Sequence, residues 1–569
     1  MTRIAIDPVT RIEGHLRIEA TVEGGKVADA WSSSTMFRGM EIVLRKRDPR
    51  DAWLFAQRSC GVCTTVHALA SVRAVEDAVG SNPPLNARLI RDVIAGTQYV
   101  QDHVIHFYHL HAFDWVDVAS ATKADPAAAS RLAQSISAWP KSSPGYFQEI
   151  RDKIAAIVNS GQPGLFANGY WGHPAYRLSP EANLVLVAHY LEALDWQREI
   201  VRVQAILGGK NPHPQTYLVG GMAIPIDPDS QAALNFARLD EERTILESAK
   251  TFVEQVYLPD AVLVASHYPE WFGYGAGHKT YMAYGDFPQP SGDVSSYRFA
   301  RGIVRYPNEA GVDAFDPAKI SEYVTRSWYA YPDERVGLHP SRGETNPTYT
   351  GPQPPFEFLN VNDKYSWLKA PRYDGEVMEV GPLARLLVSY AAGRPDIKNV
   401  LDGALRTLKL QRADLSSTLG RVVARALETQ LMSGWLLEWH DELVANVANG
   451  DLAVHDGSRW EPSSWPAECE GWGSHEAPRG SLGHWVRIES GAIANYQAVM
   501  PTTWNASPRD ARGMRGPYEA ALLGTPVADP QRPLEILRTV HSFDPCMACA
   551  VHVLDPDGGL VVRVEDDAW

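Results

Sequence analysis

Two Cys-x-x-Cys motifs near opposite ends of the chain constrain its fold more than any other feature. Cys60 and Cys63 form the first motif, and Cys546 and Cys549 form the second. Thiolate sulfur is a soft ligand that favours zinc, copper(I), iron or nickel over hard cations. If the four thiolates serve one metal, the chain must fold across its whole length of 569 residues to bring its ends together.

The interval between the motifs bears on the kind of metal site. Paired motifs of this type usually hold a structural zinc ion, and zinc ribbons close over roughly 15–20 residues between the pairs. Here the interval runs from Cys63 to Cys546. A chain of this size buries a large apolar core without a metal clip. We therefore interpret the site as a catalytic metal centre and keep structural zinc as the alternative.

Composition excludes several other functions. The formal net charge is -15 and no Lys/Arg cluster stands out, so we expect no nucleic-acid partner. We find neither a membrane-spanning apolar stretch nor the apolar core of a secretory signal at the N-terminus, so the chain alone reads as soluble and cytoplasmic. Five cysteines in so long a chain argue against a disulfide scaffold.

The hydrophobic pattern predicts a mainly α, multihelical fold with smaller β-hairpin regions, in a single large domain. Alternating apolar residues on both sides of Gly24-Gly25 predict a hairpin, and so does the pattern over 485–499. A helical face runs from Leu415 to Leu431, with Asp414 and Ser416 available as caps. Further predicted helices cover 52–80, 86–112, 180–207 and 229–256, and a last small hairpin is predicted over 551–564.

Two residues beside the cysteines are candidates for supporting the metal ligands. His67 follows Cys63 by four positions, so a helix beginning there would let its imidazole donate to the sulfur. The alternative is a core histidine bonded to a carbonyl. Asp544 precedes Pro545 and Cys546 and is a candidate acceptor near the metal; the alternative, compatible with it, is a helix N-cap.

Three segments together resemble the large, catalytic subunit of nickel–iron hydrogenases. They are Arg11-Ile12-Glu13-Gly14-His15, the run from Arg58 to His67, and the run from Asp544 to His552. The segments Phe37-Arg38-Gly39-Met40-Glu41 and Ala477-Pro478-Arg479-Gly480 are similar to those of the membrane-associated uptake group. Ser59 departs from the aliphatic residue that many relatives carry, without touching the ligand set.

The resemblance implies a nickel–iron centre bound by all four thiolates. Cys60 and Cys546 would be terminal ligands of nickel, and Cys63 and Cys549 would bridge to iron. Cyanide and carbon monoxide, installed by maturation proteins, would complete the iron. Dihydrogen would be split heterolytically at an open metal position, and Cys546 would be the first proton acceptor.

The resemblance also assigns roles around that centre. Glu13 would relay the proton, because a partly buried carboxyl has a pKa within reach of a metal thiolate; the alternative is an ordinary surface glutamate. Arg479 would overhang the open site as a fixed positive charge, oriented by Asp114 together with Asp544. Glu41 and His552 would hold a second metal ion, magnesium, completed by water.

Electron transfer requires a partner. A conducting iron–sulfur cluster takes about four cysteines, and only Cys469 is left over. We therefore expect a heterodimer with an iron–sulfur small subunit. The segment Gly208–His213 resembles the family segment that faces that subunit. The resemblance implies that residues 1–552 form the hydrogenase domain and that residues 553–569 are an extension removed by a C-terminal endopeptidase. It implies co-export with the small subunit to the periplasmic side of the membrane, where a cytochrome b is a further candidate partner; the alternative is the cytoplasm.

One alternative of another class is a respiratory quinone-reductase subunit of the same fold, an interaction scaffold without the nickel site. The presence of all four cysteines argues against it. Cofactor-reducing and hydrogen-evolving hydrogenases match the uptake-type segments less well.

Overall fold

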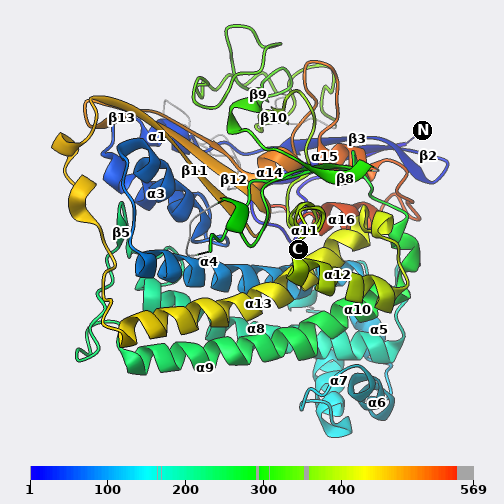
Figure 1. Cartoon of the computed structure of the whole chain (residues 1–569). Coiled ribbons are helices and arrows are strands. Elements are labelled where there is room, and N and C mark those ends of the chain that lie inside the picture. The colour runs from blue at the N-terminus through cyan, green and yellow to red at the C-terminus, as the bar shows by residue number, and fades with distance from the viewer. Residues whose placement is uncertain are drawn as a thin grey trace.

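The fold is described from a computed structural model, which covers residues 2–162, 164–167, 169–289, 294–306, 308–351 and 358–547. In Figure 1, long helices run side by side across the lower half, and the β-sheets and loops lie above them. The helices are α1 (Met40–Leu44), α2 (Ala52–Ala56), α3 (Val66–Val79), α4 (Leu85–Ile105), α5 (Val118–Ala121), α6 (Pro126–Ile136), α7 (Pro144–Asn159), α8 (Pro180–Gly208), α9 (Phe236–Phe252), α10 (Leu258–His267), α11 (Pro382–Ala391), α12 (Pro395–Leu408), α13 (Thr418–Ala448), α14 (Pro501–Asn505), α15 (Pro517–Leu522) and α16 (Leu534–Ser542).

The strands form small antiparallel sheets. They are β1 (Thr2–Ile6), β2 (Leu16–Glu23), β3 (Lys26–Ser34), β4 (Tyr217–Leu218), β5 (Gly221–Met222), β6 (Thr280–Ala283), β7 (Gly302–Arg305), β8 (Asn308–Asp313), β9 (Ile320–Tyr323), β10 (Ala370–Tyr373), β11 (Glu468–Ala477), β12 (Gly480–Glu489) and β13 (Ala492–Val499). The orders are β1-β2-β3, β6-β7-β8 and β11-β12-β13, with two-stranded pairs β4-β5 and β9-β10. The predicted mainly helical fold with small sheets is confirmed.

Local signals in the sequence explain where the long helices begin and end. Helix α8 starts at Pro180 because the Ser179 side chain accepts a hydrogen bond from the Ala182 amide, and it stops at Gly209, which has φ 77°. Helix α13 is capped by Ser417, which accepts from the Gly420 amide. The predicted caps of α13, Asp414 and Ser416, were wrong; the 3₁₀ turn Arg412–Leu415 takes up Asp414 instead.

Two other predicted helices differ in extent from the observed ones. The helix predicted over 52–80 is broken between α2 and α3 by the loop that carries the first cysteine motif. The helix predicted over 86–112 is α4 followed by a π-helical turn, His106–His111. Strand β11 was not predicted, although both strands of the hairpin predicted over 485–499 are present. The hairpin predicted over 551–564 lies outside the described residues.

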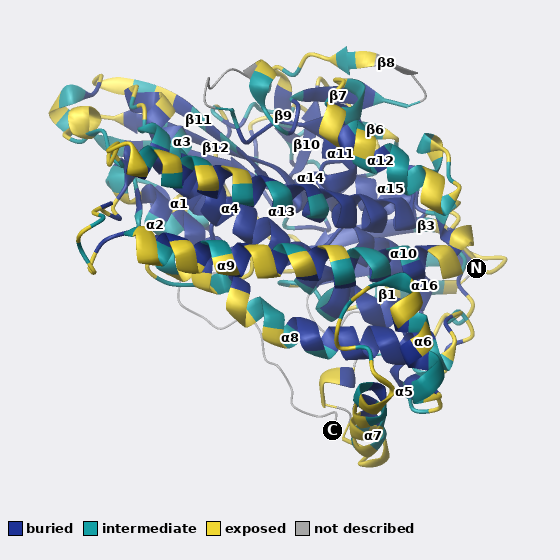
Figure 2. Ribbon diagram, turned by 60° about the horizontal axis from the view of Figure 1, so that its bottom comes forward, coloured by how far each residue is buried: buried dark blue, intermediate teal, exposed yellow. Residues whose placement is uncertain are grey.

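The core lies between the long helices. Helices α4 and α13 are largely buried, whereas α9 and α7 each carry an exposed stripe (Figure 2). Helix α4 approaches α13 closely at Gly96, where a Cβ atom would meet the Leu436 side chain at 2.9 Å. Among the described residues, no helix combines the length and apolarity needed to cross a bilayer.

Candidate metal centre

The first cysteine motif lies in the loop between α2 and α3. Both Cys60 and Cys63 are buried, and the Cys63 amide donates to the Cys60 sulfur at 3.1 Å. Arg38 fixes the start of this loop, because its guanidinium donates to the carbonyls of Ser59 at 2.8 Å and Arg58 at 2.9 Å. Protein contacts alone therefore hold both sulfurs in this loop.

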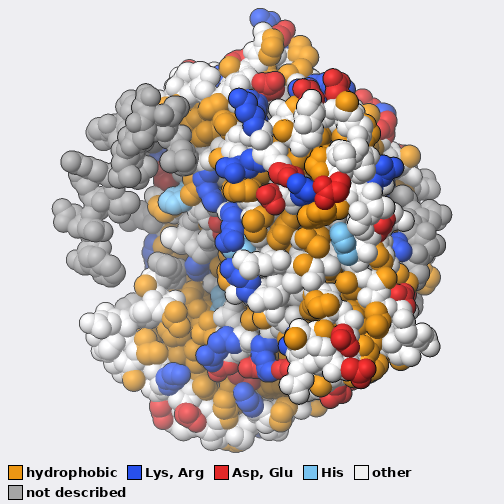
Figure 3. Space-filling model, turned by 90° about the vertical axis from the view of Figure 1, so that its left-hand side faces the viewer, with side chains coloured by type: hydrophobic (Ala, Val, Ile, Leu, Met, Phe, Trp, Pro, Cys, Tyr) orange, Lys and Arg blue, Asp and Glu red, His pale blue; other side chains and the backbone are white. Residues whose placement is uncertain are grey.

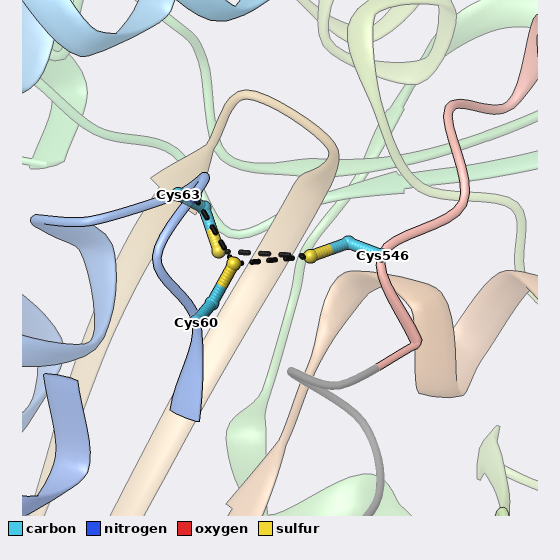
Figure 4. A group of neighbouring side chains, drawn as sticks. All are labelled: Cys60, Cys63 and Cys546. Atoms are coloured by element: carbon cyan, nitrogen blue, oxygen red, sulfur yellow. Dashed lines mark hydrogen bonds between the residues drawn. The ribbon is translucent and has the colours of Figure 1, made fainter. Parts of the chain in front are cut away.

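The second motif brings Cys546 to the same point from the far end of the chain (Figure 4). Its sulfur lies 3.4 Å from that of Cys60 and 3.7 Å from that of Cys63, and the ligand atoms of all three lie within 4.8 Å of one another. The Cys546 amide donates to the Thr502 hydroxyl at 3.2 Å. Cys549 lies outside the described residues, so the structure brings together three of the four predicted thiolates.

These separations fit one soft metal ion. Two thiolates bound at about 2.3 Å stand about 3.3 Å apart at a right angle and about 3.8 Å apart at a tetrahedral angle. The observed distances of 3.4 and 3.7 Å fall in this interval. The sulfur donors suit nickel, iron or zinc, and geometry alone leaves that choice open.

Glu13 reaches the cysteine site through main-chain pairing. The Met547 amide donates to the Glu13 carbonyl at 2.7 Å, and the Glu13 amide donates to the Pro545 carbonyl at 3.4 Å. These bonds form a short parallel bridge between the two ends of the chain. They set Oε2 of Glu13 at 3.3 Å from the Cys546 sulfur. This is the placement that a proton relay requires.

Arg479 lies at the turn between β11 and β12 and is 4% exposed. Its guanidinium forms ion pairs with Asp102 at 3.0 Å and with Asp544 at 3.1 Å. Burial alone would lower its pKa, but the carboxylates of Asp544 and Asp102 and the thiolates raise it well above the ordinary value. Burial raises the pKa of Asp102 to about 7, against the opposing effect of Arg479.

The predicted contact between Asp114 and Arg479 was wrong. Asp114 instead pairs with Arg11 at 2.5 Å and with His541 at 2.6 Å, and Asp102 occupies the place beside Arg479. The reason is the π-helical turn His106–His111, which separates Asp114 from α4, whereas Asp102 lies within that helix. The predicted contact between Asp544 and Arg479 is confirmed.

The predicted hydrogen bond from His67 to the Cys63 sulfur was also wrong. Helix α3 begins at Val66, so Cys63 lies outside it and does not share a helical face with His67. Among the described residues, the hydrogen bond of His67 joins its Nδ1 to Nε2 of His484 at 3.0 Å, and His484 contacts Tyr496 at 2.6 Å. Burial lowers the pKa of His67 to about 4, so the ring is neutral at pH 7.

Glu41, the predicted magnesium ligand, lies in an oxygen-rich cluster. Its carboxylate accepts from the Ala498 amide at 3.0 Å and from the Thr345 hydroxyl. Lys369 stands nearby, donating to Gln497 at 2.8 Å and forming an ion pair with Glu322 at 3.4 Å. Oxygen donors of this kind suit magnesium. The second predicted ligand, His552, lies outside the described residues.

The segment predicted to face a partner lies against the cysteine loop. The amide of His213 donates to the side-chain hydroxyl of Thr64, next to Cys63. His213 is a non-glycine residue with φ 63°. Its position brings residues 208–213 to the side of the molecule where the cysteine loop is exposed at Gly61 and Val62.

Sequence reasoning missed several residues around the centre. Asp102 carried no clear signal, because it lies between Gln101 and His103 in a helix that contains a second acid, Asp92. His484, Thr502 and Gln497 carried none, because each reaches the site only through the pairing of β11–β13 or the turn into α14.

The fold and the site define a protein in which two segments far apart in the chain, around Cys60 and Cys546, form a site suited to a soft metal. A family profile described as nickel-dependent hydrogenase matches residues 38–552, and a HoxL-like profile matches residues 3–33. The chain therefore belongs to the nickel-dependent hydrogenase family.

Individual relatives agree over almost the whole length. The chain is 51% identical to the uptake hydrogenase large subunit of Bradyrhizobium diazoefficiens, over 99% of this chain and 97% of that protein. It is 48% identical to the hydrogenase-1 large chain of Escherichia coli (strain K12), with the same coverage. A solved [NiFeSe] hydrogenase variant from Desulfovibrio vulgaris Hildenborough superposes with a TM-score of 0.77 at 38% identity, covering 97% of this chain and 99% of that one.

Proposed function

We propose that this chain is the catalytic subunit of an uptake hydrogenase, which oxidises dihydrogen to protons and electrons. The observation that carries the proposal is the meeting of Cys60 and Cys63 with Cys546, with the Glu13 carboxylate 3.3 Å from the Cys546 sulfur. A structural zinc site has no use for a carboxylate at that distance from a ligand. Family membership favours nickel as the metal.

The cofactor proposed for this site is a nickel–iron centre. Cys60, Cys63, Cys546 and Cys549 would hold nickel, and Cys63 and Cys549 would also bridge to iron. Cyanide and carbon monoxide on the iron, and the maturation proteins that install them, are part of the proposal. When bound, the centre supplies the open Lewis-acid position at which dihydrogen is cleaved heterolytically.

The protein's own residues then handle charge and protons. Cys546 is the proposed first proton acceptor, and Glu13 takes the proton from its sulfur toward the surface. Arg479 is buried, held by Asp102 and Asp544, and contributes a fixed positive charge over the thiolates. The pKa of Arg479 is raised well above its usual range by those carboxylates, despite burial, so it serves in electrostatic positioning and not as a base.

Electrons leave through a partner in this proposal. Cys469, the one cysteine outside the two motifs, is half-buried at the start of β11. A single cysteine cannot supply the roughly four ligands that an iron–sulfur cluster requires. We propose that an iron–sulfur small subunit docks beside the cysteine loop. Ile42, Val43 and Val62 are exposed there. Figure 3, which shows the side at the left of Figure 1, displays a run of Lys and Arg side chains along the middle of this face.

Three further features belong to the proposal. Glu41 and His552 would hold magnesium, and Gln497, Lys369 and Glu322 would surround the water molecules that complete its coordination.

A C-terminal endopeptidase would remove residues 553–569 and leave a mature domain of residues 1–552. Co-export with the small subunit would place the enzyme on the periplasmic side of the membrane, where a cytochrome b is a candidate electron acceptor.

The test is hydrogen-dependent dye reduction by the chain purified with its small subunit from a nickel-supplied, maturation-competent host. We expect activity, and we expect Glu13→Gln to lower it by a factor on the order of 100, since general acid–base steps contribute about 10²–10⁴. Glu23→Gln, at the exposed end of β2, is the matched control and should leave the rate unchanged. A metal-loaded heterodimer that reduces no dye under hydrogen would overturn the proposal.

A further inference from the structure

Asp114 lies at the centre of a buried charge cluster outside the cysteine site. Its Oδ1 accepts from the Arg11 guanidinium at 2.5 Å, and its Oδ2 faces Nδ1 of His541 at 2.6 Å. His111 faces the same Oδ2 at 3.5 Å, and Arg538 donates to the Asp114 carbonyl at 2.7 Å. Asp114 and His541 are 0% and 1% exposed, so these contacts are shielded from solvent screening.

The contacts of His541 fix its charge. Nδ1 faces the Asp114 carboxylate, and Nε2 faces the Thr10 carbonyl at 2.9 Å. Both partners only accept hydrogen bonds, whereas a neutral imidazole can donate from one nitrogen alone. The doubly protonated ring satisfies both contacts, so one carboxylate holds two cations, Arg11 and His541. Burial alone would raise the pKa of Asp114, but these two neighbours hold it well below its usual range.

The cluster joins the two chain segments that bring Glu13 to Cys546. Thr10 and Arg11 come directly before Ile12-Glu13, and His541 occupies the last turn of α16, shortly before Pro545. Arg11 and Asp544 both adopt left-handed backbone conformations, with φ of 58° and 59°. Such conformations in non-glycine residues persist where surrounding contacts enforce them. Asp114 pairs with the Arg11 side chain, and the carbonyl of His541 accepts a hydrogen bond from the Asp544 amide at 2.9 Å.

We infer that Asp114 is a positioning residue: with Arg11 and a doubly protonated His541 it clasps the two ends of the chain together and thereby sets the distance between Glu13 and the Cys546 sulfur. The use of that distance in proton transfer rests on the proposed function. The clasp itself stands on the contacts of the protein alone, so the two are tested by separate measurements.

The test is hydrogen–deuterium exchange of the purified heterodimer, followed by mass spectrometry of peptides that cover residues 9–16 and 543–547. The Asp114→Asn variant leaves Arg11 and His541 without their anion, so we expect the amides of Glu13 and Met547 to exchange at least about tenfold faster. Hydrogen oxidation should fall together with the faster exchange. Peptides from α4 and α13 should be unaffected.

Asp286→Asn is the matched control, because the buried Asp286 holds Arg73 at 3.0 Å and His475 at 2.6 Å in an Arg–Asp–His cluster elsewhere. It should leave exchange at 9–16 and 543–547 unchanged. If Asp114→Asn does not yield a folded heterodimer, His541→Gln serves, since glutamine is neutral and should raise exchange at the same two peptides. Unchanged exchange there in whichever variant folds would overturn the clasp. Faster exchange with full hydrogen oxidation would keep the clasp and overturn the proposed role of Glu13.

Discussion

Asp92 is a buried carboxyl that the proposed reaction does not use. It is 4% exposed and lines a cavity of about 260 Å³, together with Arg73, Arg88 and Arg91. Burial raises its pKa from 3.8 to about 7, even though the three arginines oppose the shift. The folded protein therefore binds this proton more tightly than the unfolded chain does.

The stability of the folded chain should consequently depend on the proton of Asp92. The proton on Asp92 contributes fully to the free energy of unfolding below pH 4. This contribution is lost as the pH rises to about 7, with a slope of no more than about 1.4 kcal/mol per pH unit. Replacing Asp92 with asparagine should remove this slope, so that the variant gains apparent Tm relative to the parent between pH 5 and pH 8. Thermal unfolding across that range checks it, with the exposed Asp240→Asn on α9 as control. Parallel curves for parent and Asp92→Asn would contradict the prediction.

Single residues also show where sequence reasoning succeeds. The cysteines, Glu13, Arg479 and Asp544 were found because each lies in a short motif, and the structure brings together all of them that it describes, including three of the four predicted thiolates. Asp114 was predicted beside Arg479, where the structure has Asp102, and the π-helical turn between the two acids decides which one faces Arg479. A deviation of that kind leaves no periodic signal.

At the scale of elements, the packing of α3 on β11 holds the first cysteine motif in place. Gly471 and Gly473 permit it, because a Cβ atom at Gly473 would overlap the backbone of α3 at Ala70 and Ala74, and one at Gly471 would overlap it at Ala74 and Ala78. Helix α3 begins three residues after Cys63. A displacement of α3 is therefore passed on to the metal ligands.

Gly473→Ala should push α3 away from β11. We expect a loss of about 2–3 kcal/mol in the free energy of unfolding, as in other overpacked cores, and a lower nickel content of the purified protein. Gly434→Ala is the control, because Gly434 lies in α13 with nothing within 4 Å of its Cβ position, and it should be neutral or add up to about 1 kcal/mol. Equal stability and nickel content in the two variants would contradict this account of the sheet–helix contact.

The elements themselves were predictable to different degrees. Helices α8 and α13 were found from their helical patterns of apolar residues, although the cap of α13 is Ser417 and not the predicted Asp414 or Ser416. Strand β11 was missed because glycines alternate along it where a strand pattern would show apolar residues. Those glycines are set by the close approach of α3, a tertiary constraint without a local signature.

At the scale of the whole molecule, the N-terminal segment and residues 544–547 meet at the cysteine site. The main chain of Glu13 pairs with Pro545 and Met547, so these two distant segments lie together beside the centre. If removal of residues 553–569 follows metal insertion, loss of one ligand should leave the extension in place. We expect the Cys60→Ser chain to keep its full-length mass. The Cys469→Ser chain, in which the cysteine outside the motifs is changed, should lose residues 553–569 as the parent does. Intact-mass spectrometry of the two variants checks this, and a shortened Cys60→Ser chain would contradict it.

The central claim is that Cys60, Cys63, Cys546 and Cys549 hold nickel with iron. It is tested most directly by the nickel, iron and zinc content of the chain purified with its small subunit from a nickel-supplied, maturation-competent host. We predict about one nickel per chain, iron in excess of nickel and no stoichiometric zinc. Stoichiometric zinc without nickel would contradict the account and return the cysteines to a structural role.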